Sequence, residues 1–128
     1  MAGNLKVELS TTLLVIDSTS NQPVLNLVFG PFVLSATAYS LDGYFQAQTT
    51  ATTVSLPAAT VYDFLIINQG ANNVTVTFTP TSGTAETIVL QPGGMVSSAQ
   101  LAEVSGGITA LSLQATTAAT PCLVFTAA

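Results

Sequence analysis

The clearest pattern of apolar and polar positions lies between Val61 and Pro80, with the sequence VYDFLIINQGANNVTVTFTP. Residues 64–67 form an unbroken apolar run, which is typical of a strand buried on both faces and predicts the centre of a sheet. From Val74 to Thr79 apolar residues alternate with threonine, which predicts a half-buried strand with an outward threonine face. Residues 68–73 are of the types favoured in tight turns, so we predict that the two strands pair as a hairpin.

The N-terminal third also has the composition of strands. Residues 5–16 alternate and then become continuously apolar, which fits one long strand or two short ones. Residues 17–23, DSTSNQP, are a predicted loop with an Asx turn at Asp17. Residues 24–29 and 32–39 are predicted to be separate strands, because Gly30-Pro31 lies between them.

Turn signals divide the middle of the chain. Asp42-Gly43 predicts a hairpin turn, and the threonine-rich segment Tyr44 to Leu56 predicts a strand near a sheet edge or a subunit boundary. Thr87 to Leu90 is a predicted short strand that ends at the turn sequence QPGG. Met95 to Glu103 lacks a β-branched run and is the one place where a short helical turn is predicted.

The C-terminal segment predicts two more strands. Residues 108–115 follow Gly106-Gly107, with Thr109, Leu111, Leu113 and Ala115 expected on one face. In the last strand, residues 121–126, Leu123 and Phe125 are expected on one side and Cys122 and Val124 on the other.

Seven to nine short strands separated by turns predict an all-β protein with a single antiparallel β-sandwich or jelly-roll-like domain. A chain of 128 residues and 13.0 kDa fits one domain, so residues 1–128 are expected to form it. Residues 1–39 are expected to form an N-terminal arm or an edge-strand segment that contacts neighbouring subunits, because this segment is apolar and its pattern is broken.

The composition predicts a surface with unusually few charged side chains. Hydrophobic residues make up 48% of the chain and charged residues 5%, whereas about a quarter of an average soluble protein is charged. Charge normally keeps proteins apart in solution, so we predict that partners cover much of this surface.

The balance of charge excludes several classes of partner. Lys6 is the one basic residue against six acidic ones, which is too few cations to neutralise a phosphate backbone or to bind an anionic membrane surface. The apolar run 13–16 is too short for a signal peptide, and the window 24–41 is interrupted by Asn26 and Gly30-Pro31, so no membrane helix is expected. The sequence therefore predicts synthesis in a cytoplasm without secretion, and neither nucleic-acid nor membrane binding.

Catalytic candidates are few. Histidine, the usual general base near neutral pH and the commonest metal ligand, is absent from the composition. Asp63 and Glu86 are the one carboxylate pair near the predicted centre that could act as in a glycosidase. The alternative, which we favour, is that Asp63 faces solvent or caps a turn. We predict that the protein is not an enzyme.

Metal and cofactor candidates are equally weak. Asp17, Thr19 and Asn21 have a spacing like that of a calcium loop, but the glycine and the closing glutamate of such a loop are missing, so a plain turn is preferred. Gly93-Gly94 and Gly106-Gly107 are not followed by the lysine and helix of a phosphate loop. We predict no catalytic, cofactor-binding or metal-binding residues, and no cofactor.

The remaining reactive and aromatic side chains have structural explanations. Cys122 lies in an apolar strand, where a free cysteine usually behaves as a small hydrophobe. Most aromatic residues lie in apolar runs, which favours core packing over a stacking or sugar-binding platform. The tyrosines, Tyr39, Tyr44 and Tyr62, are expected to reach a surface or an interface.

The segment FLIINQGANNVTVTF, followed by a short strand, QPGG, GGITALSLQA and LVFTAA, resembles small β-sandwich virion proteins of tailed phages. Capsid decoration or cement proteins and related head or tail appendages are examples of this group. The resemblance covers Tyr62 to the C-terminus and implies a structural role without an active site.

From the resemblance and the composition we predict a capsid decoration or cement protein that assembles as a symmetric homo-oligomer, a trimer or a dimer, on the phage head. Its partners would be other capsid or virion subunits, and its location the capsid surface of the virion. The alternatives are a tail or head-fibre component and a carbohydrate-binding or adhesin module. A sugar-binding module should show a groove with exposed tyrosines and carboxylates, whereas a cement protein should bury apolar flanks against other chains.

Overall fold

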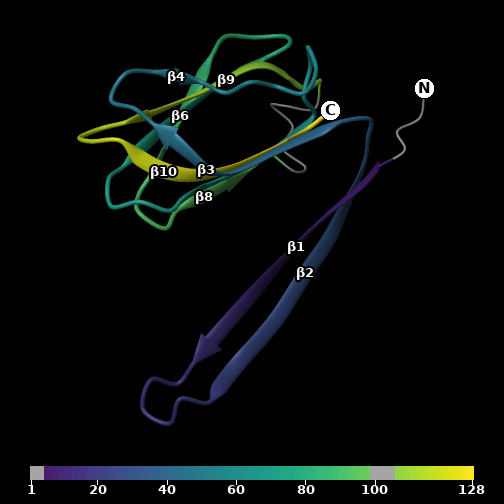
Figure 1. The fold of residues 1–128 in the computed structure, drawn as a ribbon. Helices are drawn as coiled ribbons and strands as arrows, with labels where there is room; N and C mark the ends of the chain where they lie inside the picture. Colours follow the sequence, from purple (N-terminus) through teal and green to yellow (C-terminus); the bar gives the residue numbers. More distant parts are fainter. Residues whose placement is uncertain (1–4, 99–105) are drawn as a thin grey trace.

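The computed structural model describes residues 5–98 and 106–128, and in these ranges the protein is all-β, with ten strands and no helix. The strands are β1 Leu5–Ile16, β2 Pro23–Ala36, β3 Tyr39–Ala47, β4 Thr52–Thr53, β5 Asp63–Asn68, β6 Val74–Pro80, β7 Glu86–Leu90, β8 Met95–Ser97, β9 Ile108–Ala115 and β10 Thr120–Ala127. Strands β3 to β10 form two four-stranded antiparallel sheets that pack as a sandwich, and β1 and β2 form a separate ribbon that projects from it (Figure 1). The predicted antiparallel β-sandwich is confirmed.

The two sheets have the strand orders β3-β10-β5-β8 and β4-β9-β6-β7. Among the sandwich strands of the described residues, only β6 and β7 are neighbours in both sequence and sheet. Each of the other consecutive pairs of sandwich strands has one strand in each sheet. Most hydrogen-bonded partners are therefore far apart in the sequence, as in β5 with β10 and β6 with β9.

The predicted hairpin between residues 64–67 and 74–79 is wrong. Both segments are strands, but β5 pairs with β10 and β8, whereas β6 pairs with β7 and β9 in the opposite sheet. The turn between them is an arch from one sheet to the other. Its first residue, Asn68, is fully buried, and its amide group donates to the carbonyl oxygens of Asn72 and Leu90 and accepts from the Gly70 N–H. These bonds hold the arch closed without any pairing between its two strands.

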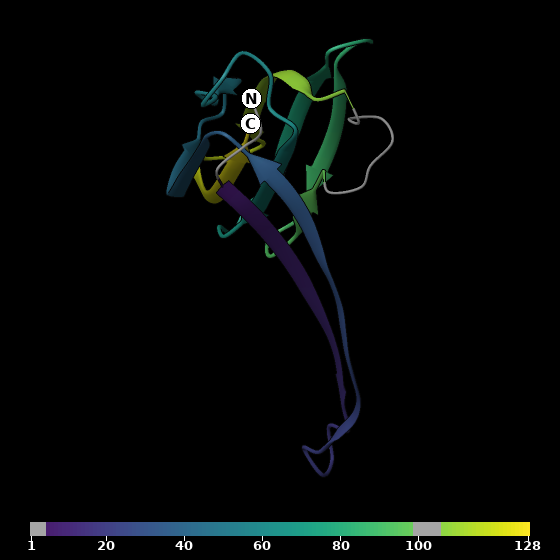
Figure 2. The same ribbon diagram turned by 90° about the vertical axis from the view of Figure 1, so that its right-hand side faces the viewer.

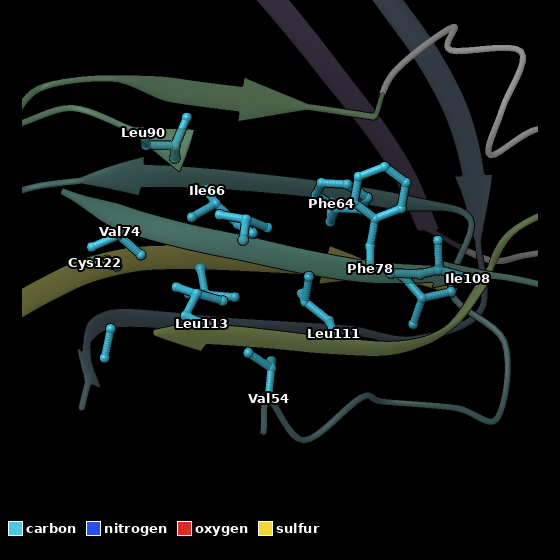
Figure 3. Close-up of a cluster of buried hydrophobic side chains, with 14 of the residues drawn as sticks. Val54, Phe64, Ile66, Val74, Phe78, Leu90, Ile108, Leu111, Leu113 and Cys122 are labelled. Atoms are coloured by element: carbon cyan, nitrogen blue, oxygen red, sulfur yellow. The ribbon is translucent and has the colours of Figure 1, made fainter. Parts of the chain in front are cut away.

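The core lies between the two sheets, where each sheet contributes its alternate residues (Figure 3). From β5 and β10 the buried side chains include Phe64, Ile66, Cys122 and Val124, as period-two alternation requires. On the facing sheet, β6 buries Val74, Val76 and Phe78, and its threonines lie on the outer face, as predicted. The rings of Phe64 and Phe78 join the two sheets, with centroids 5.5 Å apart.

Asp42-Gly43 does not form a hairpin turn. Strand β3 continues through it, and a register shift leaves Gly43 and Tyr44 opposite the single residue Leu123 of β10. The Asp42 carboxylate accepts the Tyr44 N–H at 2.9 Å, so the turn-forming residues produce a β-bulge within a strand.

The segment Tyr44 to Leu56 is not one strand. Its first residues complete β3, and the chain then bends at residues 48–51 and crosses to β4 in the other sheet. Both β3 and β4 are edge strands, so the predicted edge location is confirmed.

A local irregularity changes which residue of β9 points inward. In β9, Thr109 is exposed, because a register shift between Thr79 and Pro80 turns it outward and gives the inward position to Ile108. The last strand, β10, has the two faces predicted for it.

In the segment predicted to form a helical turn, residues 95–97 are strand β8, and residues 99–103 lie outside the described residues.

The ribbon of β1 and β2 is a hairpin whose tip lies far from the sandwich (Figure 2). Residues 5–16 form one long strand. Residues 24–29 and 32–39 were predicted to be separate strands divided by Gly30-Pro31. Residues 24–36 instead belong to one strand, because the ribbon absorbs Gly30 and Pro31 as a bulge opposite Ser10, and Tyr39 begins β3. Gly30 has a φ of 92°, a conformation that glycine adopts without a Cβ penalty.

Candidate functional site

The hairpin exposes an unusual amount of apolar surface. Eleven large apolar residues lie on its middle and distal parts, and each of them is 39–68% exposed. They are Leu13, Leu14, Val15, Ile16, Val24, Leu25, Leu27, Val28, Phe29, Phe32 and Val33. By contrast, the buried apolar residues of the sandwich core are 0–7% exposed. Exposed apolar patches of this extent usually mark an interaction surface.

The register of the hairpin separates its distal half into two different faces. Directly opposite residues point to the same face, and Leu13 pairs with Leu27, Val15 with Leu25 and Thr11 with Phe29. We call this set, Thr11, Leu13, Val15, Leu25, Leu27 and Phe29, the distal apolar face. The opposite face carries the pairs Thr12 with Val28 and Leu14 with Asn26 and is more polar.

The second feature is a groove between the root of the hairpin and the outer face of the β3-β10-β5-β8 sheet, with a volume of about 480 Å³. We call it the root groove. Its lining consists of Leu5, Lys6, Val7, Glu8 and Leu9 of β1 and of Tyr39, Leu41, Asp63, Leu65, Leu123 and Phe125 of the sheet.

The sheet side of the root groove is apolar where a solvent-facing sheet would normally be polar. Leu65 of β5 lies directly opposite Phe125 of β10, and both are half-buried. The ring of Tyr39 lies 6.3 Å from that of Phe125, and Leu41 is 58% exposed. This groove explains in part why residues 64–67 are all apolar, because Leu65 faces the root groove whereas Phe64 faces the core.

The charged side chains of the root groove are already paired or hydrogen-bonded. Lys6 Nζ and Glu8 Oε1 are 2.7 Å apart on the same strand. Asp63 is only 3% exposed, and its Oδ1 accepts a hydrogen bond from Ser98 Oγ at 2.9 Å. Ser98 Oγ in turn accepts the Phe64 N–H at 2.8 Å. Burial raises the pKa of Asp63, and the hydrogen bond from Ser98 opposes this change.

The structure does not support Asp63 and Glu86 as a catalytic pair. Asp63 begins β5, and Glu86 begins β7 in the other sheet, where it is exposed opposite Phe78. The expectation that Asp63 faces solvent or caps a turn is also wrong, because its carboxyl group is buried against Ser98. The apolar run that directly follows Asp63 could have predicted this burial, because such a run is typical of a strand that is covered on both faces.

The candidate calcium loop is the tip of the hairpin, and it forms the Asx turn predicted at Asp17. Asp17 Oδ1 accepts the N–H groups of Thr19 at 2.8 Å and Ser20 at 3.2 Å. Within residues 5–98 and 106–128, no group of three or more His, Cys, Asp or Glu side chains is arranged to hold a metal ion.

A smaller cavity of about 160 Å³ opens at the β3–β4 edge of the sandwich. Its lining includes Ser40, Asp42, Ser55 and Thr126. Asp42 is the one acidic group there, and its carboxylate already accepts a backbone N–H. The cavity therefore offers no pair of groups for acid-base catalysis.

Cys122 is a core residue, as its sequence context indicated. It is fully buried, and burial raises the pKa of its thiol to about 11, so the reactive thiolate is scarce near neutral pH. The three tyrosines are 55–69% exposed, which confirms that they reach the surface.

No protein-family model and no curated protein sequence matches the chain. Among solved structures, a similar chain belongs to Bacillus endospore appendages, described as forming a novel family of disulfide-linked pili. It is 17% identical, with a TM-score of 0.45 over 99% of this chain and 93% of that chain. A likeness of this degree carries no argument about function. Across the described part of the chain, no helix is long and apolar enough to cross a membrane.

Proposed function

We propose that this protein is a structural subunit that assembles with copies of itself through the β1–β2 hairpin, and that it does so as a decoration or cement protein on a virion. The hairpin carries this proposal. A two-stranded ribbon is at best marginally stable in water, and stability normally needs a third strand or packing against another element. No third strand pairs with β1 or β2 among the described residues. A neighbouring subunit would supply the missing packing.

The total surface area supports the same conclusion. The chain has an accessible surface of 7376 Å², whereas a folded monomer of its mass, 13.0 kDa, is expected to have about 6,300 Å². The excess is about 1,000 Å², similar to the ~800 Å² that each partner buries in a standard interface. A subunit shaped for an assembly carries such an excess when it is considered alone.

The energies favour a closed oligomer, in which every copy makes two contacts, over two copies joined by a single contact. Covering the five large apolar side chains of the distal apolar face, each about half exposed, contributes on the order of 5 kcal/mol. The loss of translational and rotational freedom on association costs at least about 4 kcal/mol. One such contact is therefore weak, but a closed ring gives every copy two contacts and a stable assembly.

The strand order is compatible with the virion part of the proposal. We infer a jelly roll, because two four-stranded sheets with the orders β3-β10-β5-β8 and β4-β9-β6-β7 are connected almost entirely across the sandwich. Jelly rolls are frequent in viral capsid proteins and in lectins, so the fold alone does not choose between the two. The resemblance to phage virion proteins, from Tyr62 onward, favours the former.

A carbohydrate-binding module remains the second candidate, because Tyr39 and Asp63 line the root groove. The chemistry of the groove favours a protein partner. Apolar side chains and one tyrosine dominate its lining, and its acidic groups are already bonded within the chain. A sugar ring needs several free polar groups around an aromatic face.

The purified protein should be studied by light scattering, native mass spectrometry and electron microscopy from low to high salt. We expect a closed oligomer with two or three copies that persists at high salt, because six acidic residues and one basic residue cannot supply the interface energy. A monomer at all concentrations would overturn the proposal. Open filaments would favour a tail or fibre component instead, and glycan-array binding without assembly would favour the sugar-binding module.

A further inference from the structure

We infer that the distal apolar face of one copy docks into the root groove of a second copy. This inference specifies the contact through which the proposed assembly forms, and it therefore depends on the proposed function. The two surfaces are apolar features left uncovered in the described part of the chain, and they differ in shape. The hairpin projects as an arm, and the root groove is concave.

The contact has to be made between copies. The root groove has Leu5, Val7 and Leu9 of β1 as one wall, so the proximal half of the hairpin already occupies that side. The distal half continues from the same strand and points away from the sandwich in both views (Figures 1 and 2). A hairpin cannot fold back onto the groove that its own root forms.

The dimensions of the two surfaces agree. The distal segment of β1, residues 11–16, is about 20 Å long at ~3.3 Å per residue. The sheet side of the groove is crossed by β10, which has eight residues and is about 26 Å long on the same scale. The strand along which a distal hairpin would lie is therefore long enough for it, and Leu123 and Phe125 are the residues of this strand that line the groove itself.

Charges do not oppose the contact. The distal apolar face contains five apolar residues and Thr11, and it carries no charge. In the root groove Lys6 and Glu8 neutralise each other, and Asp63 is hydrogen-bonded to Ser98. Asp63 is already only 3% exposed, so docking would add little to the cost of burying charge, which is the main penalty for closing such a groove.

These observations favour a second copy over an unrelated protein. A convex surface and a concave surface of matching chemistry are present on one chain, so each copy can both donate and receive a hairpin. Such a head-to-tail contact closes into a ring or continues as a filament, depending on the rotation between copies. The excess surface of about 1,000 Å² exceeds the ~800 Å² that a copy buries in one of its two contacts in a ring.

The test is cysteine cross-linking between two differently labelled proteins. Leu27→Cys lies on the distal apolar face, and Leu41→Cys lies in the root groove at a position 58% exposed. The ¹⁵N-labelled L27C protein is mixed with unlabelled L41C protein, allowed to exchange subunits and treated with a short bis-maleimide. Native Cys122 is fully buried and should not react. We expect mixed cross-links, identified by mass.

The matched control is Thr12→Cys, which lies on the opposite face of the hairpin, on the neighbouring strand β1. L27C should cross-link to L41C at least about tenfold faster than T12C does, because docking raises the effective concentration of one pair of thiols. Tyr39→Cys, at a second exposed groove position, replaces L41C if that variant does not fold.

The outcomes separate the two proposals. If the protein is oligomeric but L27C cross-links only to L27C, hairpins pack against each other, and the docking inference is overturned while the proposed function stands. If L27C and T12C react equally with L41C in an oligomer, docking is again overturned. If no oligomer forms, the proposed function itself fails.

Discussion

The sandwich and the hairpin are built from residues of the same kinds but have opposite relations to water. In the sandwich, eight strands bury one face of each sheet, and the core residues are 0–7% exposed. In the distal part of the hairpin, the two strands have no opposing layer among the described residues, and residues as apolar as those of the core are 39–68% exposed. The sandwich covers its apolar residues within the chain, whereas the hairpin leaves its own uncovered.

This difference shows that hydrophobic residues in one small protein can have separate tasks. Core residues such as Ile66 contribute to the stability of the single chain. Exposed residues such as Leu27 contribute little to it and are available for association. The same substitution should therefore have different consequences in the two regions, which the following predictions use.

The largest effect is expected for Ile66→Asp in the sandwich. Ile66 is fully buried between β10 and β8, so the substitution places an unpaired charge in the core and should prevent folding, with a cost above about 4 kcal/mol. Thr77→Asp, on the outer face of β6, is the control and should melt close to the wild type. Circular dichroism melts measure both, and equal melts would contradict the assigned faces.

The next effect is expected for Leu27→Asp in the hairpin. Leu27 is 43% exposed, so the sandwich should keep its melting temperature, with a change in the free energy of unfolding within about 0.5 kcal/mol when both proteins are monomeric. The assembly should be lost, because a charge cannot enter an apolar contact without a counter-charge.

Asn26→Asp is the matched control for this hairpin variant, since it places the same charge on the opposite face of the same strand. Light scattering should find L27D monomeric and N26D assembled. If both variants assemble, the hairpin is not the interface.

A moderate effect is expected for Gly70→Ala in the arch between the sheets. An added Cβ would collide with Thr120 Cγ2 and lie 2.8 Å from Pro121 Cδ, so the variant should lose about 1–3 kcal/mol of stability. Gly43→Ala is the control, because no atom lies within 4 Å of an added Cβ there. Denaturant unfolding measures both, and an unchanged G70A protein would contradict the close approach of the arch to β10.

The smallest effect concerns Asp63, where the sandwich and the hairpin root meet. Its pKa is raised in the folded state, so the folded protein holds this proton more tightly than the unfolded chain. The wild type should therefore lose stability as the pH rises from the ordinary value of 3.8 toward the raised folded value. Asp63→Asn can still accept from Ser98 and has no charge to bury.

The stability of D63N relative to the wild type should consequently increase with pH over this window and then level off. Denaturant titrations at a series of pH values measure the difference. A relative stability that does not change with pH would mean that the Asp63 carboxylate is solvated in the folded protein.

The candidate site was predictable in part. The apolar N-terminal segment and the low charge indicated a surface that needs covering, and the tip loop and its Asx turn at Asp17 followed from local hydrogen bonding. The root groove was not predictable, because its lining comes from β1, β3, β5 and β10, which only the folded chain brings together. The burial of Asp63 depends on Ser98 of the segment after β8 in the same way.

The sequence by itself determined where strands form and which face of most strands is buried, because both properties depend on local alternation and on the residues that interrupt it. Residues 68–73 were predicted to be a turn, and residues 42–43 a hairpin turn. Only the tertiary structure decided that the first is an arch between sheets and the second a bulge within β3. Turn-forming residues permit either an arch or a bulge, and the choice depends on strands such as β10 that lie far along the chain.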